Sequence, residues 1–485
     1  MADSAKIRLN KVLRELNISL DRAVDYLASK GHEIEARPTT KISDEDPDWD
    51  AHWDPIWQKN RIEEGGEPRS NVHIWVSLNA QLQEVGKAGP VDELEAKTQW
   101  LRELADASDG GVILLKCGRN AKDDYQEAHA VFDKFGDVEL PTPKEHFGFA
   151  DGIGDPVFEG QYRETEMPEK VIGRGKRVKD KWEPIATGEF ILGHPDESQE
   201  LPPAAMPAEF SNNGTFMAFR KLHENVASFA DVVTKEALRY AEVMEMPEAE
   251  ARETLMAKMC GRWSDGVPLA RFPTYAEWQA LRKQKGFDNP DPALALKNQS
   301  AYIHSSHASD FRFADDMPGY KVPGGAHIRR MNTRDYLDPT NEGGVDQNGV
   351  PHLNTDATHA LNKRRRILRR GLPYGSSDPS TNSDTTEQGV AMMLIGASLF
   401  RQFEFVQQQW VQYGLDFHQG NNTCPMLGRH DHHTRHMIPS DPKSGKPPYM
   451  MTRLKTFVEC RGGDYFFVPS MIALRMIAMG IVDPT

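Results

Sequence analysis

Cysteine is scarce in this chain of 485 residues, and its four copies lie far apart. Cys117, Cys260, Cys424 and Cys460 show no paired spacing, which argues against a disulfide framework, a zinc ribbon and an iron–sulfur site. This cysteine usage fits a reducing compartment.

Long apolar runs are also missing. Residues 1–10 are charged and have neither the apolar core nor the cleavage pattern of a secretory leader. The longest apolar stretches, 389–400 and 467–482, are too short to cross a bilayer or are interrupted by Arg475. We therefore expect a cytoplasmic protein that has no membrane-spanning helix and no membrane partner.

An excess of positive charge is absent as well. The formal net charge of −14 argues against a general nucleic-acid binder, although local basic pockets for anions remain compatible with it. Hydrophobic residues make up 38% and charged residues 27%, as in globular proteins, and the length allows two or three domains.

The N-terminal region predicts a small appended module. Residues 5–46 show helical spacing at Ile7, Val12, Leu13 and Leu16, followed by a second helix over 20–29. The next 24 residues, 47–70, are acidic, and Trp49, Trp53 and Trp57 share one helical face, which is more typical of packing than of a site. We treat 47–70 as a linker.

The rest of the chain alternates between the two periodicities. We predict strands over 71–79, 111–117, 389–396, 452–460 and 465–468, and helices over 94–105, 124–135 and 399–413 and from Pro469. This order indicates an α+β fold of two related ferredoxin-like modules, 71–230 and 231–485, with irregular insertions at 155–210 and 330–385.

The first segment that suggests chemistry is 324–334, where His327 stands close to Arg329, Arg330 and Arg334 after two glycines. A neutral imidazole is a good ligand for haem iron, and a guanidinium matches the two oxygens of a haem propionate. We interpret His327 as an axial iron ligand and Arg334 as a propionate partner. By itself the segment is also typical of a solvated basic surface loop.

The second segment, 147–156, places Asp151 among glycines that let the backbone approach a flat ligand. A carboxylate over a haem face can take a proton from hydrogen peroxide and return it to the outer oxygen. An ordinary Asp-Gly turn is the alternative. Asp155 is a competing acid, but its place before Pro156 indicates a turn residue.

The third segment, 364–375, carries five arginines, most of which we expect to be solvated. Arg369 beside an iron would stabilise negative charge on a departing oxygen. The alternative is a basic run that binds phosphate or nucleic acid, which the overall acidity disfavours.

A histidine-rich run, 430–436, has a spacing that allows a divalent metal, although a solvated loop is the better interpretation. A non-haem metal enzyme that uses these histidines is one alternative for the whole chain. No Cys-x-x-Cys-His motif occurs, so any haem would be held without covalent links.

These segments occur in the order found in dye-decolorising haem peroxidases, which the chain resembles from about residue 70 to its end. The resemblance rests on residues 148–152, 326–330 and 367–375, with support from 188–193, 213–216, 260–263 and 461–467. They look like the longer-chain branch of that family. Residues 9–34 instead resemble the N-terminal helical module of bacterial translation initiation factor two.

The resemblance implies two ferredoxin-like modules with non-covalent haem b between them. It implies His327 as the proximal metal ligand, Asp151 and Arg369 as the catalytic distal pair, and Arg334 near a propionate. The implied activity is reduction of hydrogen peroxide coupled to one-electron oxidation of organic donors such as dyes and phenols. Tyr374, Trp263 and Tyr465 are either electron relays or plain core packing.

A haem carrier or sensor with little turnover remains the alternative function, and homo-oligomerisation stays open. Two positions depart from the family pattern. Thr333 replaces a frequent Pro, and residues 424–428, which begin at Cys424, stand where many members have an Asp-Pro. If that Asp accepts the proximal imidazole N–H, this chain uses another acceptor, for which Asp384, Glu387 and Asp431 are candidates.

Overall fold

The computed structural model describes residues 53–58, 72–83, 89–178, 181–337, 359, 361–420, 422–430 and 434–481, and the backbone of two short strands. Those strands, β1 (Ile7–Arg8) and β2 (Lys41–Ile42), pair antiparallel. Ile7 therefore lies in a strand and not in the helix predicted for it. The remainder of the predicted 5–46 module lies outside the described residues, as does Trp49.

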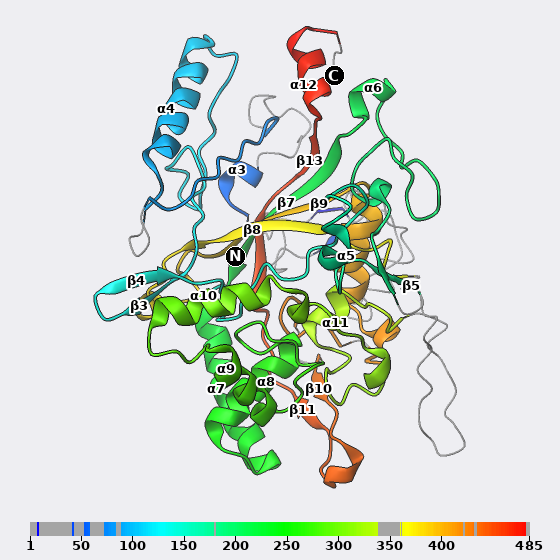
Figure 1. Ribbon diagram of the computed structural model, residues 1–485. Coiled ribbons are helices and arrows are strands. Elements are labelled where there is room, and N and C mark those ends of the chain that lie inside the picture. Colours follow the sequence, from blue (N-terminus) through cyan, green and yellow to red (C-terminus); the bar gives the residue numbers. More distant parts are fainter. Residues whose placement is uncertain are drawn as a thin grey trace.

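An antiparallel sheet forms the centre of the α+β fold (Figure 1). Its strand order is β12-β7-β9-β8, and β13 also pairs with β7. The bounds are β7 (Thr215–Glu224), β8 (Leu368–Gly375), β9 (Gln388–Gly396), β12 (Val458–Gly462) and β13 (Tyr465–Val468). β7 thus joins the two predicted modules, because it lies before residue 230 and every described strand that pairs with it lies beyond that residue.

The two faces of β7 follow from its period-two pattern. Met217 and Phe219 point to one face, where they pack with Trp57, whereas Ala218 points to the other face and packs with Leu394 and Phe403. Trp57 belongs to the short helix α3 (Pro55–Gln58), and its ring centroid lies 5.3 Å from that of Phe219. The predicted packing role of this tryptophan is confirmed.

A group of helices covers the lower side of the sheet in Figure 1. They are α7 (Val226–Met244), α8 (Glu248–Cys260), α9 (Tyr275–Lys285), α10 (Pro292–Ile303) and α11 (His327–Met331). Phe229, Val233 and Tyr240 repeat at helical spacing on α7 and are buried against α8. Gly261 caps the end of α8, and its φ of 97° places it in the left-handed region that favours glycine.

The remaining elements are short or lie at the periphery. The helices are α4 (Asp92–Ala107), α5 (Met167–Lys170), α6 (Ala208–Ser211) and α12 (Met471–Ala478). Three antiparallel hairpins are β3 (Phe132–Phe135) with β4 (Val138–Pro141), β5 (Lys176–Val178) with β6 (Lys181–Glu183), and β10 (His436–Ile438) with β11 (Tyr449–Met451). No helix of the described segments combines the length and the apolar character that a membrane span requires.

The predictions for residues 71–135 are largely wrong. Helix 94–105 is confirmed within α4, but residues 72–80 and 111–116 form no strand, and Ile74 and Val76 are exposed. Alternation shows which side chains share a face, whereas a strand also needs a neighbouring chain to complete its hydrogen bonds. Within the described residues no strand pairs with either segment.

The helix predicted over 124–135 is also wrong, because its end is strand β3. Gly136 and Asp137 connect β3 to β4, and Gly136 has a φ of 64°. A two-residue Gly-Asp connection is a hairpin signal that competes with the helical spacing of the apolar residues before it. The turn, rather than the preceding periodicity, determines the structure here.

Most of the elements predicted for the C-terminal part of the chain are confirmed. Strands 389–396 and 465–468 and the helix after Pro469 are confirmed, as is helical structure over 399–413, although much of it is a wider π-helix (Phe400–Glu404 and Val406–Val411). The strand predicted over 452–460 is wrong for 452–457, since β12 begins only at Val458.

Candidate functional site

His327 is the first residue of α11 and follows the tight turn at 324–325. A side chain on Gly325 would lie 2.9 Å from Nδ1 of His436, so the turn has room only for glycine. The side chain of His327 is half-buried, and burial and then the charge of Arg369 lower its pKa to about 4. The imidazole is therefore neutral over the physiological range, as an iron ligand must be.

The arginines that follow His327 are not solvated, which corrects the interpretation of this segment as a basic surface loop. Arg329 is fully buried, pairs with Asp316 at 3.2 Å and stacks on the ring of Tyr336. Arg330 is equally buried and donates to the backbone oxygens of Trp410 and Asn422. Both guanidiniums therefore fix α11, and with it His327, to the surrounding chain.

Arg334, like Arg330, pairs with no carboxylate in the described residues, but it donates to one backbone oxygen there whereas Arg330 donates to three. Arg334 is 2% exposed, donates to the backbone oxygen of Phe311 at 3.1 Å and lies 3.8 Å above that ring. Its Nε has no hydrogen-bond partner. Burial, followed by repulsion from Arg366 and Arg262, holds the pKa of Arg334 well below its ordinary value.

Sequence reasoning missed a histidine beside this arginine. His359 is 1% exposed, and neither of its ring nitrogens has a hydrogen-bond partner. Burial, Arg334 and Arg366, in that order, hold its pKa well below the ordinary value. Buried donors without partners beside unbalanced positive charge indicate a site for an anionic group such as a carboxylate.

Asp151 lies on a loop that the backbone holds in place. Its own N–H donates to the oxygen of Pro143, and the N–H of Ala150 donates to the oxygen of Ser264. Gly148 and Gly152 flank the acid with φ of 93° and 74°, so glycine is needed on both sides. The 147–156 segment is therefore more than a simple Asp-Gly turn.

A second carboxyl group, also missed by the sequence, shapes this loop. The two oxygens of Glu145 accept the N–H groups of Phe147 and Phe149, each at 2.8 Å. Burial raises the pKa of Glu145 to about 7, and burial and then Glu145 raise that of the neighbouring Glu224 well above its ordinary value. The pair therefore retains a proton close to the loop of Asp151 at neutral pH.

Arg369 reaches Asp151 from strand β8, and the two form an ion pair at 3.3 Å. Burial acts to raise the pKa of Asp151, but Arg369, the Gly152 N–H and His327 together lower it below its ordinary value. The Asp151 side chain nevertheless keeps 41% of its surface accessible. The carboxylate is therefore ionised at neutral pH and remains open to contact by a small molecule.

Asp155, the competing acid, has a different task. It forms an ion pair with Arg370 and accepts the backbone N–H of Arg369 at 3.3 Å. Asp155 thus anchors the start of β8, which presents Arg369 to Asp151. The prediction that Asp155 is not the distal acid agrees with this placement.

The structure brings three of the four predicted site residues within electrostatic reach of one another. Asp151 and Arg369 are in contact, and the charges of both act on the pKa of His327. Arg334 belongs to a neighbouring cationic cluster with Arg262 and Arg366, and Arg262 also senses Arg369 and Asp151. The four residues therefore belong to one region of the molecule.

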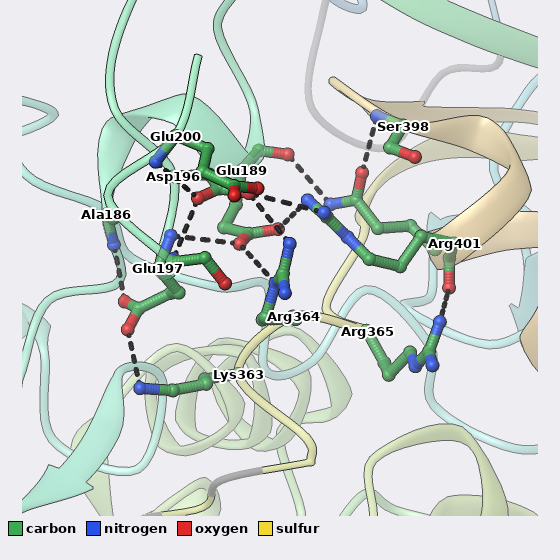
Figure 2. A network of polar contacts seen from close by, with 12 residues as sticks. Ala186, Glu189, Asp196, Glu197, Glu200, Lys363, Arg364, Arg365, Ser398 and Arg401 are labelled. Atoms are coloured by element: carbon green, nitrogen blue, oxygen red, sulfur yellow. Dashed lines mark hydrogen bonds and ion pairs between the residues drawn. The ribbon is translucent and has the colours of Figure 1, made fainter. Parts of the chain in front are cut away.

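Most of the other arginines in the 364–370 segment are paired rather than solvated, contrary to expectation. Figure 2 shows Arg364 and Arg401 converging on the carboxylates of Glu189 and Asp196. Glu189 is fully buried and comes from the 188–193 stretch. Only Arg370, with 60% of its side chain accessible, faces solvent to a large extent, so this run offers little open basic surface for phosphate or nucleic acid.

The described ends of the histidine-rich run are not solvated either. His436 is buried, contacts the backbone oxygen of Lys258, and has its pKa lowered to about 3 by burial. His430 contacts the hydroxyls of Thr423 and Thr434. Residues 431–433 lie outside the described residues, and within the described part no group of three or more metal-binding side chains occurs.

The three candidate relay residues differ in exposure. Trp263 and Tyr374 are buried, whereas Tyr465 is 42% exposed and donates its hydroxyl hydrogen to Glu404 at 2.8 Å. Trp263 stacks on Trp278 within a core cluster, which is ordinary packing. Tyr465 alone of the three reaches the surface.

The residues present fit a haem. Nε2 of His327 has no hydrogen-bond partner among the described residues, and its other nitrogen contacts the sulfur of Cys424 at 3.4 Å. The unpartnered donors of Arg334 and His359 suit the two carboxylates of a porphyrin. Asp151 and Arg369 supply an acid–base group and a cation in the same region.

No protein-family model matches the chain. It is 27% identical over 349 residues to the dye-decolorizing peroxidase msp1 of Mycetinis scorodonius, covering 69% of this chain and 56% of that protein. It is 26% identical over 404 residues to a dye-decolorizing peroxidase of Exidia glandulosa, covering 78% and 67%. The chain thus spans little more than half the length of msp1.

An N-terminal segment has a separate likeness, to translation initiation factor IF-2 of Christiangramia forsetii. The two are 76% identical over 45 residues, which are 9% of this chain and 5% of that protein. The resemblance predicted for this end of the chain is confirmed.

Solved structures establish the fold. An ancestral D-type dye decolorizing peroxidase matches with a TM-score of 0.52 at 23% identity, covering 80% of this chain and 72% of that one. The peroxidase of Auricularia auricula-judae gives 0.52 at 22% identity, with coverages of 80% and 73%. The chain therefore has the α+β fold of the dye-decolorising peroxidases and resembles them in sequence over most of its length.

Proposed function

We propose that this protein is a haem peroxidase that reduces hydrogen peroxide and oxidises organic donors, such as dyes and phenols, in one-electron steps. The observation that carries the proposal is the Asp151–Arg369 ion pair within electrostatic reach of a neutral His327. An acid–base group, a cation and an imidazole are what this reaction needs from the protein.

The cofactor we propose is haem b, held without covalent links. His327 would hold the iron through its free Nε2, and Arg334 with His359 would bind the propionates. A bound haem supplies the redox chemistry that no amino-acid side chain can supply. The buried side chains of Arg329 and Arg330 fix α11, the helix from which the imidazole projects.

Asp151 is the proton carrier. Its lowered pKa keeps it ionised at mildly acidic pH, so it can accept the proton of the inner peroxide oxygen and pass it to the outer oxygen, which leaves as water. Arg369 stabilises the negative charge that develops on the departing oxygen. Asp155 keeps Arg369 in place through the backbone of β8.

Donors too bulky to reach the haem would transfer electrons through an aromatic side chain at the surface. Of the three predicted relays, Tyr465 is favoured because it is the exposed one. The cytoplasmic location and the division at residue 230 stay predictions. Cell fractionation and limited proteolysis, respectively, test them.

The experiment uses the full chain loaded with haem. We expect a Soret band, and peroxide-dependent oxidation of a phenol or dye at mildly acidic pH. Asp151→Asn should slow the reaction with peroxide roughly 10²–10⁴-fold while the Soret band stays, because a positioned general acid–base contributes about this much. Stopped-flow absorbance measures that rate.

Asp231→Asn is the matched control, since it removes the same charge from an exposed helical ion pair with Lys235. It should react at the wild-type rate. A Soret band without turnover in the wild type would replace the peroxidase with a haem carrier or sensor. Wild-type speed in Asp151→Asn would remove the role assigned to this residue.

A further inference from the structure

Of the described residues, the one that contacts the second ring nitrogen of His327 is a cysteine. The sulfur of Cys424 lies 3.4 Å from Nδ1, and Cys424 is fully buried. The neutral tautomer that leaves Nε2 free carries its proton on Nδ1, so the Nδ1–H donates to the sulfur. The sulfur of Cys424 is thus the acceptor of the imidazole N–H in this chain, where many members of the family have an Asp.

The backbone fixes the sulfur in this place. The N–H of Cys424 donates to the oxygen of Val411 at 2.7 Å, at the end of the π-helical segment. The N–H of Gly428 donates back to the oxygen of Cys424 at 2.8 Å, which closes the turn that follows. A side chain on Gly428 would lie 2.3 Å from that oxygen, so the turn depends on this glycine.

The acceptors expected from the sequence are engaged elsewhere. Asp384 accepts hydrogen bonds from the N–H and the hydroxyl of Ser228, and Glu387 forms an ion pair with Lys221. Asp431 lies outside the described residues. The prediction that Asp384 or Glu387 accepts the imidazole proton is therefore wrong, because both carboxylates are committed to other groups.

A sulfur is a weaker hydrogen-bond acceptor than a carboxylate. A carboxylate behind a metal-bound imidazole draws its proton away and makes the ring a stronger electron donor. We propose that Cys424 is the positioning residue of His327, and that its sulfur keeps the imidazole a weak donor, which raises the iron reduction potential above that with a carboxylate acceptor.

This inference rests on the proposed function only in that His327 must bind a haem iron. Its test is the ferric–ferrous midpoint potential of the haem-loaded full chain, together with the iron–histidine stretching frequency of the ferrous form. Cys424→Asp should favour the ferric state at least about tenfold, a fall of about 59 mV, and should raise the stretching frequency. In Cys424→Asn the new side chain has nearly the shape of Asp but no charge. Its midpoint potential and stretching frequency should therefore stay close to those of the wild type.

Cys117→Ser is the matched control, since this half-buried thiol contacts the oxygen of Leu115 and not His327. It should change neither quantity. If Cys424→Asp does not retain haem, the iron–histidine stretching frequency of the wild type still tests the proposal. It should equal the frequency of imidazole–haem compounds in which the ring N–H is weakly hydrogen-bonded. A wild-type frequency typical of a carboxylate-bonded ring would overturn the proposal.

The two hypotheses fail in distinguishable ways. An unchanged potential and frequency in Cys424→Asp, with haem bound, would refute the role of Cys424 and leave the peroxidase intact. A shifted potential without peroxide turnover would refute the peroxidase and leave the role of Cys424. A wild-type chain that binds no haem would refute both.

Discussion

Two arginine-rich segments of similar composition have different surroundings in this protein. In the segment around α11, Arg329 and Arg330 are buried and hold backbone oxygens and aromatic faces. In the segment that leads into β8, Arg364 and Arg369 are partly accessible and face carboxylates.

The difference separates arginines that stabilise the fold from arginines that can act on a bound ligand. A buried guanidinium that donates to carbonyl oxygens of a distant segment fixes the chain, because these hydrogen bonds tie the two segments together. One that keeps an accessible face beside a carboxylate can act on a ligand. Arg334 meets neither condition fully, since it is 2% exposed, pairs with no carboxylate in the described residues and donates to one backbone oxygen there.

Of the arginines in the two segments, Arg369 should have the largest effect on the reaction rate. Arg369→Leu should slow the reaction of the haem-loaded protein with peroxide roughly 10²–10³-fold, because it removes a preorganised cation from a developing negative charge. Stopped-flow absorbance measures the rate. Arg370→Leu, which changes the neighbour on the other face of β8, is the control. Equal rates in the two variants would show that Arg369 has no special role in the reaction.

Arg329 tests the structural side of the comparison. Arg329→Met should destabilise the fold by about 3–5 kcal/mol, because it leaves Asp316 as an uncompensated buried charge. Urea unfolding followed by circular dichroism measures the loss. The double variant Arg329→Met with Asp316→Leu should recover much of it, and no recovery would contradict the ion pair as the cause.

The network in Figure 2 should show a smaller effect. Glu189→Gln keeps the shape of the side chain but removes the charge that Arg364 and Arg401 share, which should cost about 1–3 kcal/mol. Thermal unfolding measures it. Haem binding and turnover at low temperature should be unaffected, and a selective loss of turnover would place this network in the catalytic region.

The pH profile sharpens the role of Arg369 further. The reaction with peroxide needs the Asp151 carboxylate, so the rate is full above the pKa of Asp151 and falls as the pH drops through it. Burial acts to raise this pKa, whereas the charges of Arg369 and His327 lower it. The carboxyl groups of Glu145 and Glu224 also interact electrostatically with Asp151. Arg369→Leu should therefore move the acid limb to higher pH, and an unmoved limb in stopped-flow rates would contradict the coupling.

The smallest effect should be that of Arg370. Its side chain is 60% accessible, so Arg370→Gln should change stability by less than about 1 kcal/mol despite the ion pair with Asp155. Urea unfolding again measures it. A loss as large as that of Arg329→Met would show that exposure does not separate the two segments.

The chemistry-bearing residues could be found in the sequence because each stands in a short local pattern. Asp151 is flanked by glycines, His327 follows two glycines, and Arg369 stands in a run of five arginines. The strand that carries Arg369 was not predicted, because β8 lies within residues 330–385, for which we expected an irregular insertion. His359 and Glu145 could not be found in this way. Their significance lies in the partners that burial gives or denies them, and those partners come from distant segments.

The secondary structure, too, could be predicted in some segments and not in others. β9 and β13 were predictable because apolar periodicity and real pairing coincide there, whereas at 72–80 the periodicity has no partner strand in the described structure. The sequence by itself determined which side chains are available for haem chemistry and in which order. Only the tertiary structure decided that Cys424 faces His327 and that Glu189 faces two arginines, because a hydrogen-bond partner is set by distance in space and not by spacing along the chain.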